Sequence, residues 1–368
     1  MKHRTPFVSK VLCLLLCLFL LLALFACEKK EAKISVAYFD ADGEHLTTEW
    51  VLPDYDPASR PLPEDTEEWH YTKWEVTLSG DITVCTAKRV AKTKVIFKDF
   101  DGTVLKEAVF TEEESEPRLD LPTSTERWIY TGWQKTTAES EIIYTAERTP
   151  NAAYFSGNVF QIVLRNAAGE PISTGSGFVF HEDGWFITNN HVMENGDSAT
   201  AYFDIPDRVQ GTKHTMLAVL GGVYHDETKD VFIGKLENYE KIRSHYHPIS
   251  FTEEYTQGET CYSIGYPLSS ITMEINTGSI ITEYSDIHDK INGVYYVLSD
   301  SYIAPGSSGG ILVNEAFEVI GITTLGFYTD STHSVYVSGG SVPTSIFKMH
   351  LMGLTDSSLR PLYLIYST

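Results

Sequence analysis

The apolar positions of the chain form one long run near the N-terminus and many short runs after it. Residues 11–26 are all apolar, whereas the later runs are short and are separated by turns rich in Gly, Asp and Asn. Few stretches follow the period of an amphipathic helix, and 21 Tyr and 18 Phe favour strands. The pattern therefore predicts a mainly β protein behind an apolar leader.

The leader has the form of an export signal, because Lys2, Arg4 and Lys10 precede the apolar run. The run ends in Leu24-Phe25-Ala26-Cys27 and three charged residues follow, which resembles the lipobox of bacterial lipoproteins. The resemblance implies a signal peptide over residues 1–26, lipidation of Cys27 and a linker over residues 27–33. It also implies a location on the outer face of the bacterial cytoplasmic membrane. An uncleaved signal anchor is the alternative, and it leaves the rest of the chain on the same side.

Residues 34–150 contain an internal repeat with a constant offset of 59 residues. The recurring pairs include Asp40/Asp99, Asp42/Asp101, Gly43/Gly102, Trp69/Trp128, Tyr71/Tyr130, Trp74/Trp133 and Arg89/Arg148. We therefore expect two modules, over residues 34–92 and 93–150. The Asp-x-Asp-Gly element is more typical of a hairpin turn than of a calcium loop. The modules resemble the internalin-type B repeats of bacterial surface proteins, which implies a β-grasp fold and a spacer or an arm for a cell-wall or surface ligand.

From residue 151 onward, short strands at regular spacing predict a β-barrel or sandwich that contains a candidate base and its orienting acid. Residues 174–180 and 183–192 read as a hairpin that brings His191 to the end of a strand. Asp230 directly precedes the alternating strand of residues 231–236, whereas Asp226, the competing acid, lies farther from it. Alone, each of these residues is a weak signal.

The loop Pro305-Gly306-Ser307-Ser308-Gly309-Gly310, which is followed by an apolar strand, suits an oxyanion hole. Its glycines permit tight backbone geometry, so the amides of Gly306 and Ser308 can converge on a carbonyl oxygen that gains charge. A plain Gly/Ser turn is the alternative for this loop in isolation. Together with His191 and Asp230, the loop supplies a base, an orienting acid and a nucleophile in Ser308. Ser307 is the competing nucleophile.

In residues 155–350 these motifs, together with Glu318-Val319-Ile320-Gly321-Ile322, resemble the trypsin-like peptidases of clan PA, specifically the HtrA/Deg protease domain. The resemblance implies a chymotrypsin-like double β-barrel over residues 151–352, with His191 and Asp230 on the first barrel and Ser308 on the second. It also implies a short helix after Val342-Pro343. We expect a tail over residues 353–368 and no PDZ domain.

The same resemblance locates a substrate pocket. Trypsin-like enzymes that cut after Lys or Arg carry a carboxylate six residues before the nucleophile, where this chain has Tyr302. Thr324, Leu325 and Gly326 are expected to shape the pocket wall. An uncharged pocket predicts cleavage after small or medium apolar residues.

Composition bears on whether the protein binds nucleic acid, forms disulfides or holds a metal or cofactor. Fifty acidic against 28 basic residues give a formal net charge of −22, which argues against nucleic-acid binding. Cys85 and Cys261 fall in different expected domains, so a disulfide framework is not expected. His245 and His247 alternate along the chain without an evident third ligand, so we expect neither a metal nor a cofactor. The sequence thus predicts an exported, membrane-anchored serine endopeptidase that acts on proteins or peptides. The alternative is a noncatalytic surface binding protein with a protease-like domain.

Overall fold

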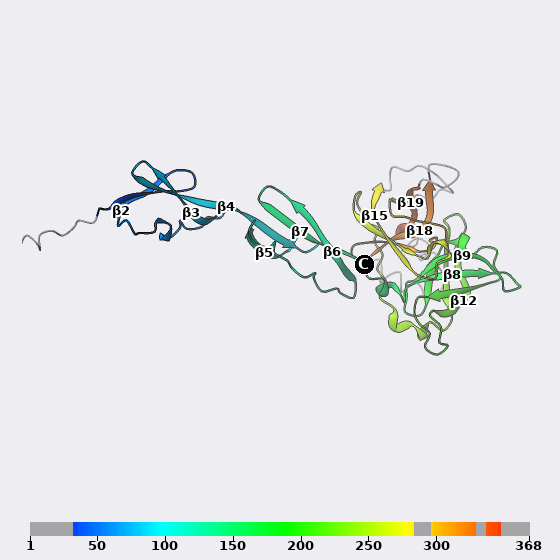
Figure 1. Cartoon of the computed structure of the whole chain (residues 1–368). Coiled ribbons are helices and arrows are strands. Elements are labelled where there is room, and N and C mark those ends of the chain that lie inside the picture. Colours follow the sequence, from blue (N-terminus) through cyan, green and yellow to red (C-terminus); the bar gives the residue numbers. More distant parts are fainter. Residues whose placement is uncertain (1–31, 283–295, 329–335, 347–368) are drawn as a thin grey trace, which may run out of the picture. The chain divides into compact units, whose positions relative to one another are not determined.

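The computed structural model describes residues 32–282, 296–328 and 336–346 (Figure 1). It divides into two compact units. The first holds the described residues up to Pro122 together with Thr131–Glu147, and the second holds Thr123–Tyr130 and the described residues from Arg148 onward. Strands dominate both units, so the predicted mainly β class is confirmed.

The repeat region forms one sheet in which the same strand arrangement occurs twice. β1 (Ile34–Phe39) pairs antiparallel with β2 (His45–Val51) and parallel with β4 (Ile82–Lys98), and β3 (Trp69–Ser79) pairs antiparallel with β4. The second half of β4 then pairs antiparallel with β5 (Val104–Thr111) and parallel with β7 (Glu141–Pro150), which is bonded to β6 (Trp128–Thr137). The expected module boundary between residues 92 and 93 therefore lies inside β4.

Each repeat contains an aromatic pair at matching positions of its core. The rings of Tyr38 and Trp74 meet edge to face with centroids 5.1 Å apart, and those of Phe97 and Trp133, 59 residues on, do so at 5.4 Å. The indole N–H of Trp74 donates to the Arg60 carbonyl at 2.9 Å. These aromatic residues therefore serve the core, as their spacing in the sequence indicates.

The second unit contains two closed barrels of six antiparallel strands, which confirms the predicted double barrel (Figure 1). The first barrel consists of β8 (Val159–Arg165), β9 (Pro171–Val179), β10 (Trp185–Thr188), β11 (Ser198–Phe203), β12 (Thr215–Asp226) and β13 (Val231–Leu236). The second consists of β14 (Thr260–Gly265), β15 (Glu274–Thr282), β16 (Val297–Ser299), β17 (Ile311–Asn314), β18 (Val319–Tyr328) and β19 (Tyr336–Pro343). The helical elements are α2 (Asn190–Met193) and the 3-10 turns η1 (Pro57–Ser59), η2 (Ala152–Phe155), η3 (Tyr239–Lys241), η4 (Arg243–His245) and η5 (Pro267–Ser269).

A hydrophobic cluster joins the two barrels. Phe178 and Ile187 of the first barrel are fully buried in the same cluster as Ile311 and Val342 of the second. Such packing fixes elements in one relative arrangement, because interiors are close-packed and tolerate little displacement. The residues at the ends of these strands are therefore held at fixed positions relative to one another across the two barrels.

The segment Thr123–Tyr130 packs on the second barrel. The Trp128 ring lies 4.7 Å from the Phe317 ring, and the Arg148 guanidinium lies 3.7 Å above Trp128. In the first repeat, Arg89 lies 4.1 Å above Trp69 in the same way. Thr123–Tyr130 and the residues from Arg148 onward thus belong to the unit of the barrels, whereas the sequence predicts a single module over residues 93–150.

Several predicted segments lie outside the described residues. They are the signal peptide over residues 1–26, Cys27 with most of the linker, and the tail over residues 353–368. Residues 344–346 form a helical turn where the helix after Pro343 is expected, and the rest of that predicted segment also lies outside the described residues. Within the ranges that the structure describes, no helix is long and apolar enough to cross a membrane.

Candidate active site

His191 lies on α2, one turn beyond the strand end at which the sequence placed it. β10 ends at Thr188, and Asn189 follows as the N-terminal cap residue of the helix. The Asn189 side-chain amide donates to the Asp230 carbonyl at 3.0 Å and to the Thr324 hydroxyl at 2.9 Å. Asn189 thus connects the histidine segment with Asp230 and with the second barrel.

Asp230 contacts His191 through both carboxylate oxygens. Oδ2 lies 2.8 Å from His191 Nδ1, and Oδ1 accepts the His191 backbone N–H at 2.9 Å. A carboxylate only accepts hydrogen bonds, so the proton of a neutral His191 ring resides on Nδ1 and leaves Nε2 free to act as a base. The competing acid, Asp226, accepts the backbone N–H of Lys229 at 2.9 Å. The structure therefore pairs His191 with Asp230, the residue that the sequence favours.

Asp230 owes its position to an unusual backbone conformation. Its φ is +55°, in the left-handed region that Asp and Asn adopt more readily than other side chains with a Cβ. The next residue, Val231, begins β13 and is fully buried. The chain thus turns sharply just before the strand and aims the carboxylate at α2.

Ser308 lies in the loop between β16 and β17, and its hydroxyl donates to the Thr324 carbonyl at 3.1 Å. In the part of the chain that the structure describes, no hydrogen bond joins this hydroxyl to His191. Rotation about the Cα–Cβ bond redirects it, and such bonds often tighten only when substrate binds. The Ser307 hydroxyl accepts the Ala304 backbone N–H at 3.4 Å within its own loop, and Ser307 is buried. The structure therefore favours Ser308 over Ser307 as the nucleophile.

The peptide groups of the Ser308 loop are held in fixed directions. The Leu268 N–H donates to the Pro305 carbonyl at 2.6 Å, and the Gly310 N–H donates to the Ser307 carbonyl at 2.9 Å. In a trans peptide the N–H points away from the carbonyl of the same group. The N–H groups of Gly306 and Ser308 are therefore directed away from those bonds, and neither has an acceptor among the described residues. Two unengaged amides in one loop are what an oxyanion hole requires.

Two glycines of this loop are required by geometry. Gly306 has a φ of +99° and Gly309 a φ of +87°, conformations that other L-residues rarely adopt. A Cβ on Gly309 would lie 2.0 Å from the Ser176 carbonyl oxygen and 2.1 Å from the Thr188 hydroxyl. The loop thus packs directly against the first barrel, backbone to backbone.

The residues expected to form the substrate pocket are only partly brought together. Tyr302 is 45% exposed and meets the Tyr336 ring edge to face at 5.1 Å. A Cβ on Gly326 would lie 3.0 Å from the Tyr328 ring. The Thr324 side chain instead bonds Asn189, and Leu325 packs against the cluster that joins the barrels. The structure thus brings Tyr302, Tyr328 and Tyr336 together as one group of adjacent rings, and no motif in the sequence marks Tyr336.

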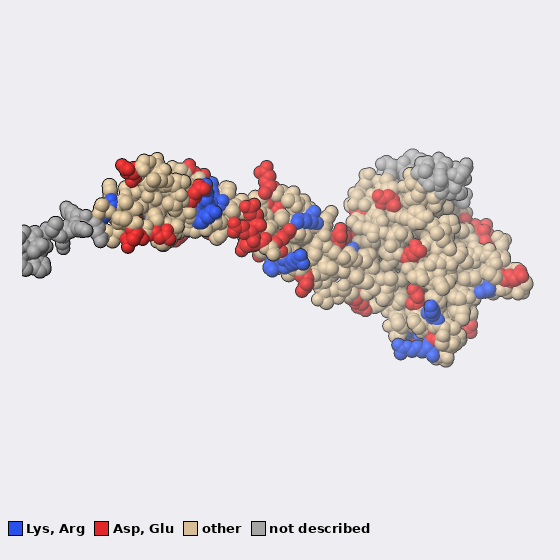
Figure 2. Space-filling model, viewed as in Figure 1, with Lys and Arg blue, Asp and Glu red and all other residues tan. Residues whose placement is uncertain are grey.

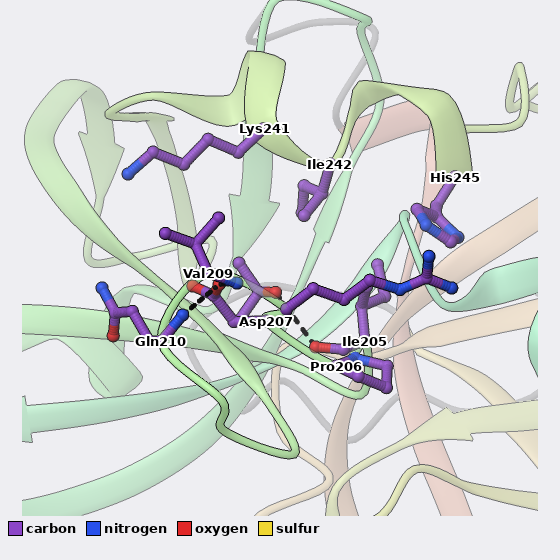
Figure 3. A pocket seen from close by; sticks show the side chains of 10 residues that line it. Ile205, Pro206, Asp207, Val209, Gln210, Lys241, Ile242 and His245 are labelled. Carbon is purple, nitrogen blue, oxygen red and sulfur yellow. Dashed lines mark hydrogen bonds between the residues drawn. The ribbon is translucent and has the colours of Figure 1, made fainter.

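A pocket of about 590 Å³ on the first barrel is distinct from these residues (Figure 3). Lys241, Ile242 and His245 face the loop that carries Asp207, Val209 and Gln210. None of the predicted site residues lines this pocket. Within the described ranges, no group of three or more His, Cys, Asp and Glu residues is arranged to hold a metal ion.

Comparison with known proteins places the site in a recognised domain. Residues 175–322 match the trypsin-like peptidase domain family. Over 162 residues the chain is 29% identical to the human (Homo sapiens) protein "Serine protease HTRA3", covering 42% of this chain and 34% of that protein. Over 174 residues it is 31% identical to the "Probable periplasmic serine endoprotease DegP-like" of Brucella suis, covering 47% and 30%. The chain thus spans about a third of the length of these relatives.

Among solved structures, the chain is similar to the serine endoprotease from Yersinia pestis. It is 22% identical, with a TM-score of 0.43, covering 58% of this chain and 69% of that chain. The family match and the curated relatives support a serine endopeptidase domain of the HtrA-like type, as the motifs predict.

Proposed function

We propose that the protein is an exported serine endopeptidase that cleaves protein or peptide substrates through an acyl-enzyme on Ser308. The observation that carries the proposal is the double contact between Asp230 and His191, at 2.8 Å and 2.9 Å. A paired carboxylate fixes the ring and stabilises the imidazolium that forms when the histidine accepts a proton. Together with the family match, this supports catalysis over the alternative of a noncatalytic binding protein.

In the proposed reaction His191 transfers protons in both halves, and Ser308 is the covalent nucleophile. His191 Nε2 accepts the Ser308 hydroxyl proton while Oγ attacks the scissile carbonyl, and the amides of Gly306 and Ser308 stabilise the resulting oxyanion. The imidazolium then gives the proton to the leaving amine, which breaks the peptide bond. Water, activated by the same histidine, hydrolyses the ester and restores the serine.

Labelling with a fluorophosphonate probe tests the catalytic role of Ser308 without knowledge of the natural substrate. We expect the wild type to react and Ser308→Ala to lose labelling and proteolysis, since removal of a triad nucleophile costs about 10⁴ to 10⁶ in kcat. Ser307→Ala is the matched control, because its hydroxyl lies in the same loop but bonds Ala304. An unreactive wild type, or equal labelling of Ser308→Ala, contradicts the proposal.

The location at the outer face of the bacterial cytoplasmic membrane is also a proposal, and it rests on the lipobox-like sequence that ends in Cys27. A diacylglyceryl group on that cysteine would hold the protein at the membrane surface. Growth with a palmitate analogue tests it, since the wild type should incorporate the label and Cys27→Ser should not. An unlabelled wild type favours the uncleaved signal anchor.

We further propose that the two repeats act as a spacer or as an arm for a cell-wall or surface ligand, like the internalin-type B repeats that they resemble. The matching aromatic cores of the two repeats support their being copies of one structural unit.

Acidic and basic side chains are interspersed on the face of the protein that Figure 2 shows, and no continuous basic stripe is visible on that face.

A further inference from the structure

Ser176 of the first barrel lies against the oxyanion loop of the second. It belongs to β9 and is fully buried. Its backbone N–H donates to the Ser308 carbonyl at 2.7 Å, and its own carbonyl accepts the Thr188 hydroxyl at 2.6 Å. The backbone N–H of Ser176 therefore binds the nucleophile loop, in addition to any contact that its side chain makes.

The Ser176 side chain adds two further bonds. Its hydroxyl donates to the Gly306 carbonyl at 2.8 Å and accepts the Tyr266 backbone N–H at 2.9 Å. One donor and one acceptor bond use the proton of the hydroxyl and one of its lone pairs. A side chain buried in this way has a single orientation, because any other leaves the donor unsatisfied.

The Gly306 carbonyl belongs to the peptide group that separates the two oxyanion amides. The N–H of that same group, on Ser307, donates to the Ala304 carbonyl at 2.9 Å. The group is thus held at both ends, by Ser176 at the oxygen and by Ala304 at the nitrogen. Rotation of this group would move the amides of Gly306 and Ser308 relative to one another.

The turn that holds the preceding peptide group is strained. Leu268, whose N–H binds the Pro305 carbonyl, has a φ of +54°, and Ser269 has a φ of +59°. Such residues persist only when their surroundings determine their conformation. The surroundings include two residues of β9, since Ser176 binds the Tyr266 N–H and the Thr174 hydroxyl lies 3.1 Å from the Ser269 hydroxyl.

We propose that Ser176 is a positioning residue that locks the oxyanion loop in the geometry that stabilises the transition state. It does not touch the reacting atoms and acts through the Gly306 carbonyl and the Tyr266 amide. The inference rests on the proposed function, because an oxyanion hole has a role only if Ser308 forms an acyl-enzyme. It assigns a function to a hydroxyl in the Gly175-Ser176-Gly177-Phe178 motif that lies on the opposite barrel from the nucleophile.

The test compares Ser176→Ala with Ser341→Ala in the full chain. Ser341 is the matched control because it is a fully buried serine of a barrel strand whose hydroxyl has no hydrogen-bond partner among the described residues. The readouts are kcat and KM on a peptide substrate, affinity for a peptide aldehyde as transition-state analogue, affinity for the matching peptide acid, and the thermal midpoint. An interaction that exists only in the transition state lowers kcat and leaves KM unchanged.

For Ser176→Ala we expect kcat to fall by about 10-fold to 100-fold, while KM stays within about twofold of the wild-type value. This loss in kcat is smaller than the loss expected when an entire oxyanion donor is removed. Affinity for the aldehyde should fall by a similar factor while affinity for the acid stays constant. Loss of folded protein alone would not change the ratio of these affinities. Ser341→Ala should retain wild-type values.

Two results overturn the inference while leaving the proposed function intact. One is an active wild type in which folded Ser176→Ala keeps kcat within twofold. The other is a loss of kcat in Ser176→Ala with unchanged aldehyde affinity. A wild type without hydrolysis or fluorophosphonate labelling overturns the proposed function, and the inference falls with it.

Discussion

The Asp230 carboxylate binds the His191 ring at Nδ1 and the His191 backbone N–H at the same time, with one oxygen for each. The second contact ties the carboxylate to the main chain of α2, so ring orientation is coupled to the start of that helix. An acid that contacted the ring alone would leave the imidazole free to tilt. The two bonds together define which ring nitrogen is free.

We predict that Asp230→Asn lowers kcat by about 10³ to 10⁴ with little change in thermal stability. The asparagine oxygen can still accept the His191 backbone N–H, but its amide then donates to Nδ1. The ring proton moves to Nε2, so that the ring has no free nitrogen for the Ser308 proton. The measurement is kcat on a peptide substrate together with the thermal midpoint.

Asp226→Asn is the matched control, because Asp226 lies in the same turn and accepts the Lys229 backbone N–H rather than binding His191. Its kcat should stay within about threefold of the wild type, as expected for a surface turn. If the two variants lose equal activity, the assignment of Asp230 as the orienting acid is wrong.

Gly309→Ala should destabilise the barrel unit strongly and abolish fluorophosphonate labelling. The new Cβ would lie 2.0 Å from the Ser176 carbonyl oxygen, and the φ of +87° is itself unfavourable for alanine. Strain of this kind adds backbone displacement to a conformational cost of about 1–2 kcal/mol. Thermal unfolding and probe labelling of the same preparation measure both effects.

Gly211→Ala separates the effect of the close Cβ contact from the effect of the positive φ. Gly211 has a φ of +70° but has no atom within 4 Å of its added Cβ, so only the conformational cost of about 1 kcal/mol applies. Labelling should persist in this variant. Equal destabilisation of both variants would show that the close contact with the Ser176 carbonyl does not contribute to the destabilisation by Gly309→Ala.

The short apolar strands between clear turn signals predicted a β-barrel or sandwich, and the resemblance to the trypsin-like peptidases predicted the double barrel that the structure shows. His191, Asp230 and Ser308 could be predicted as the triad because they stand in short local motifs, and the structure brings His191 and Asp230 into contact. The continuity of β4 across the module boundary was not predictable, since a strand that changes partners midway has no local signal. Ser176 was missed for a related reason: its partners, Gly306 and Tyr266, lie 130 and 90 residues away and use backbone atoms.

We predict that cleavage follows apolar residues rather than Lys or Arg. Tyr302 is uncharged and lies against the Tyr336 ring, so a basic side chain in the expected pocket would lack a carboxylate partner there. Burial of an unpaired charge costs several kcal/mol. Profiling of a mixed peptide library should show Val, Ala or Leu before the cleaved bond.

Substitutions at Tyr302 test whether this residue determines the preference for the residue before the cleaved bond. Tyr302→Asp should increase the share of cleavage after Arg and Lys, and Tyr302→Phe, which keeps the ring, should leave the preference as it is. Dominant cleavage after basic residues by the wild type would show that the pocket is formed by other residues.

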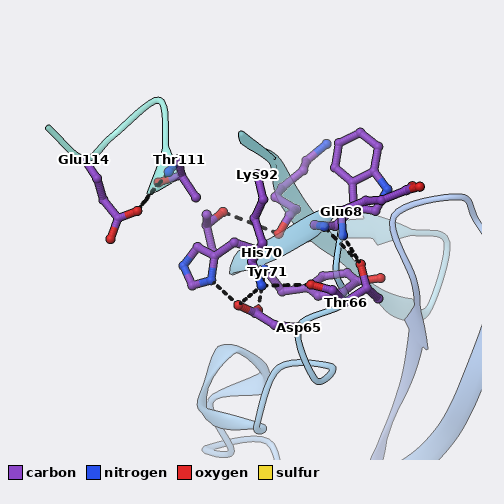
Figure 4. Close-up of polar contacts among 11 residues, drawn as sticks. Asp65, Thr66, Glu68, His70, Tyr71, Lys92, Thr111 and Glu114 are labelled. Atoms are coloured by element: carbon purple, nitrogen blue, oxygen red, sulfur yellow. Dashed lines mark hydrogen bonds and ion pairs between the residues drawn. The ribbon is translucent and has the colours of Figure 1, made fainter. Parts of the chain in front are cut away.

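Asp65 contacts His70, Tyr71 and Lys92 in the first repeat (Figure 4), and we predict that these contacts make the stability of the repeat depend on pH. Its pKa lies well below the usual range, chiefly because of the hydrogen bond with His70 at 2.8 Å, then because of Lys92 and the Tyr71 backbone N–H. A depressed pKa in the folded state means that the carboxylate stabilises the fold above the ordinary titration range of an aspartate. This contribution is lost as the pH falls below about 4.

The second repeat has Ser124 at the matching position, where its hydroxyl accepts the Tyr130 backbone N–H at 3.1 Å. Asp65→Ser should therefore keep the backbone bond and lose the hydrogen bond with His70 and the ion pair with Lys92. At pH 7 we expect the thermal midpoint of the repeat unit to fall by about 2–5 °C, a modest change because these contacts are exposed. At pH 3 the difference from the wild type should be smaller. Scanning calorimetry of the full chain at both values measures it.

Glu64→Gln is the control for loss of charge alone, because Glu64 is the exposed neighbour of Asp65 and removes the same formal charge when neutralised. It should leave the midpoint within about 1 °C at both pH values, as most surface substitutions do. An equal fall in Glu64→Gln would mean that net charge, and not the contacts with His70 and Lys92, sets the stability. A difference between Asp65→Ser and the wild type that is the same at pH 7 and pH 3 would contradict the depressed pKa of Asp65 itself.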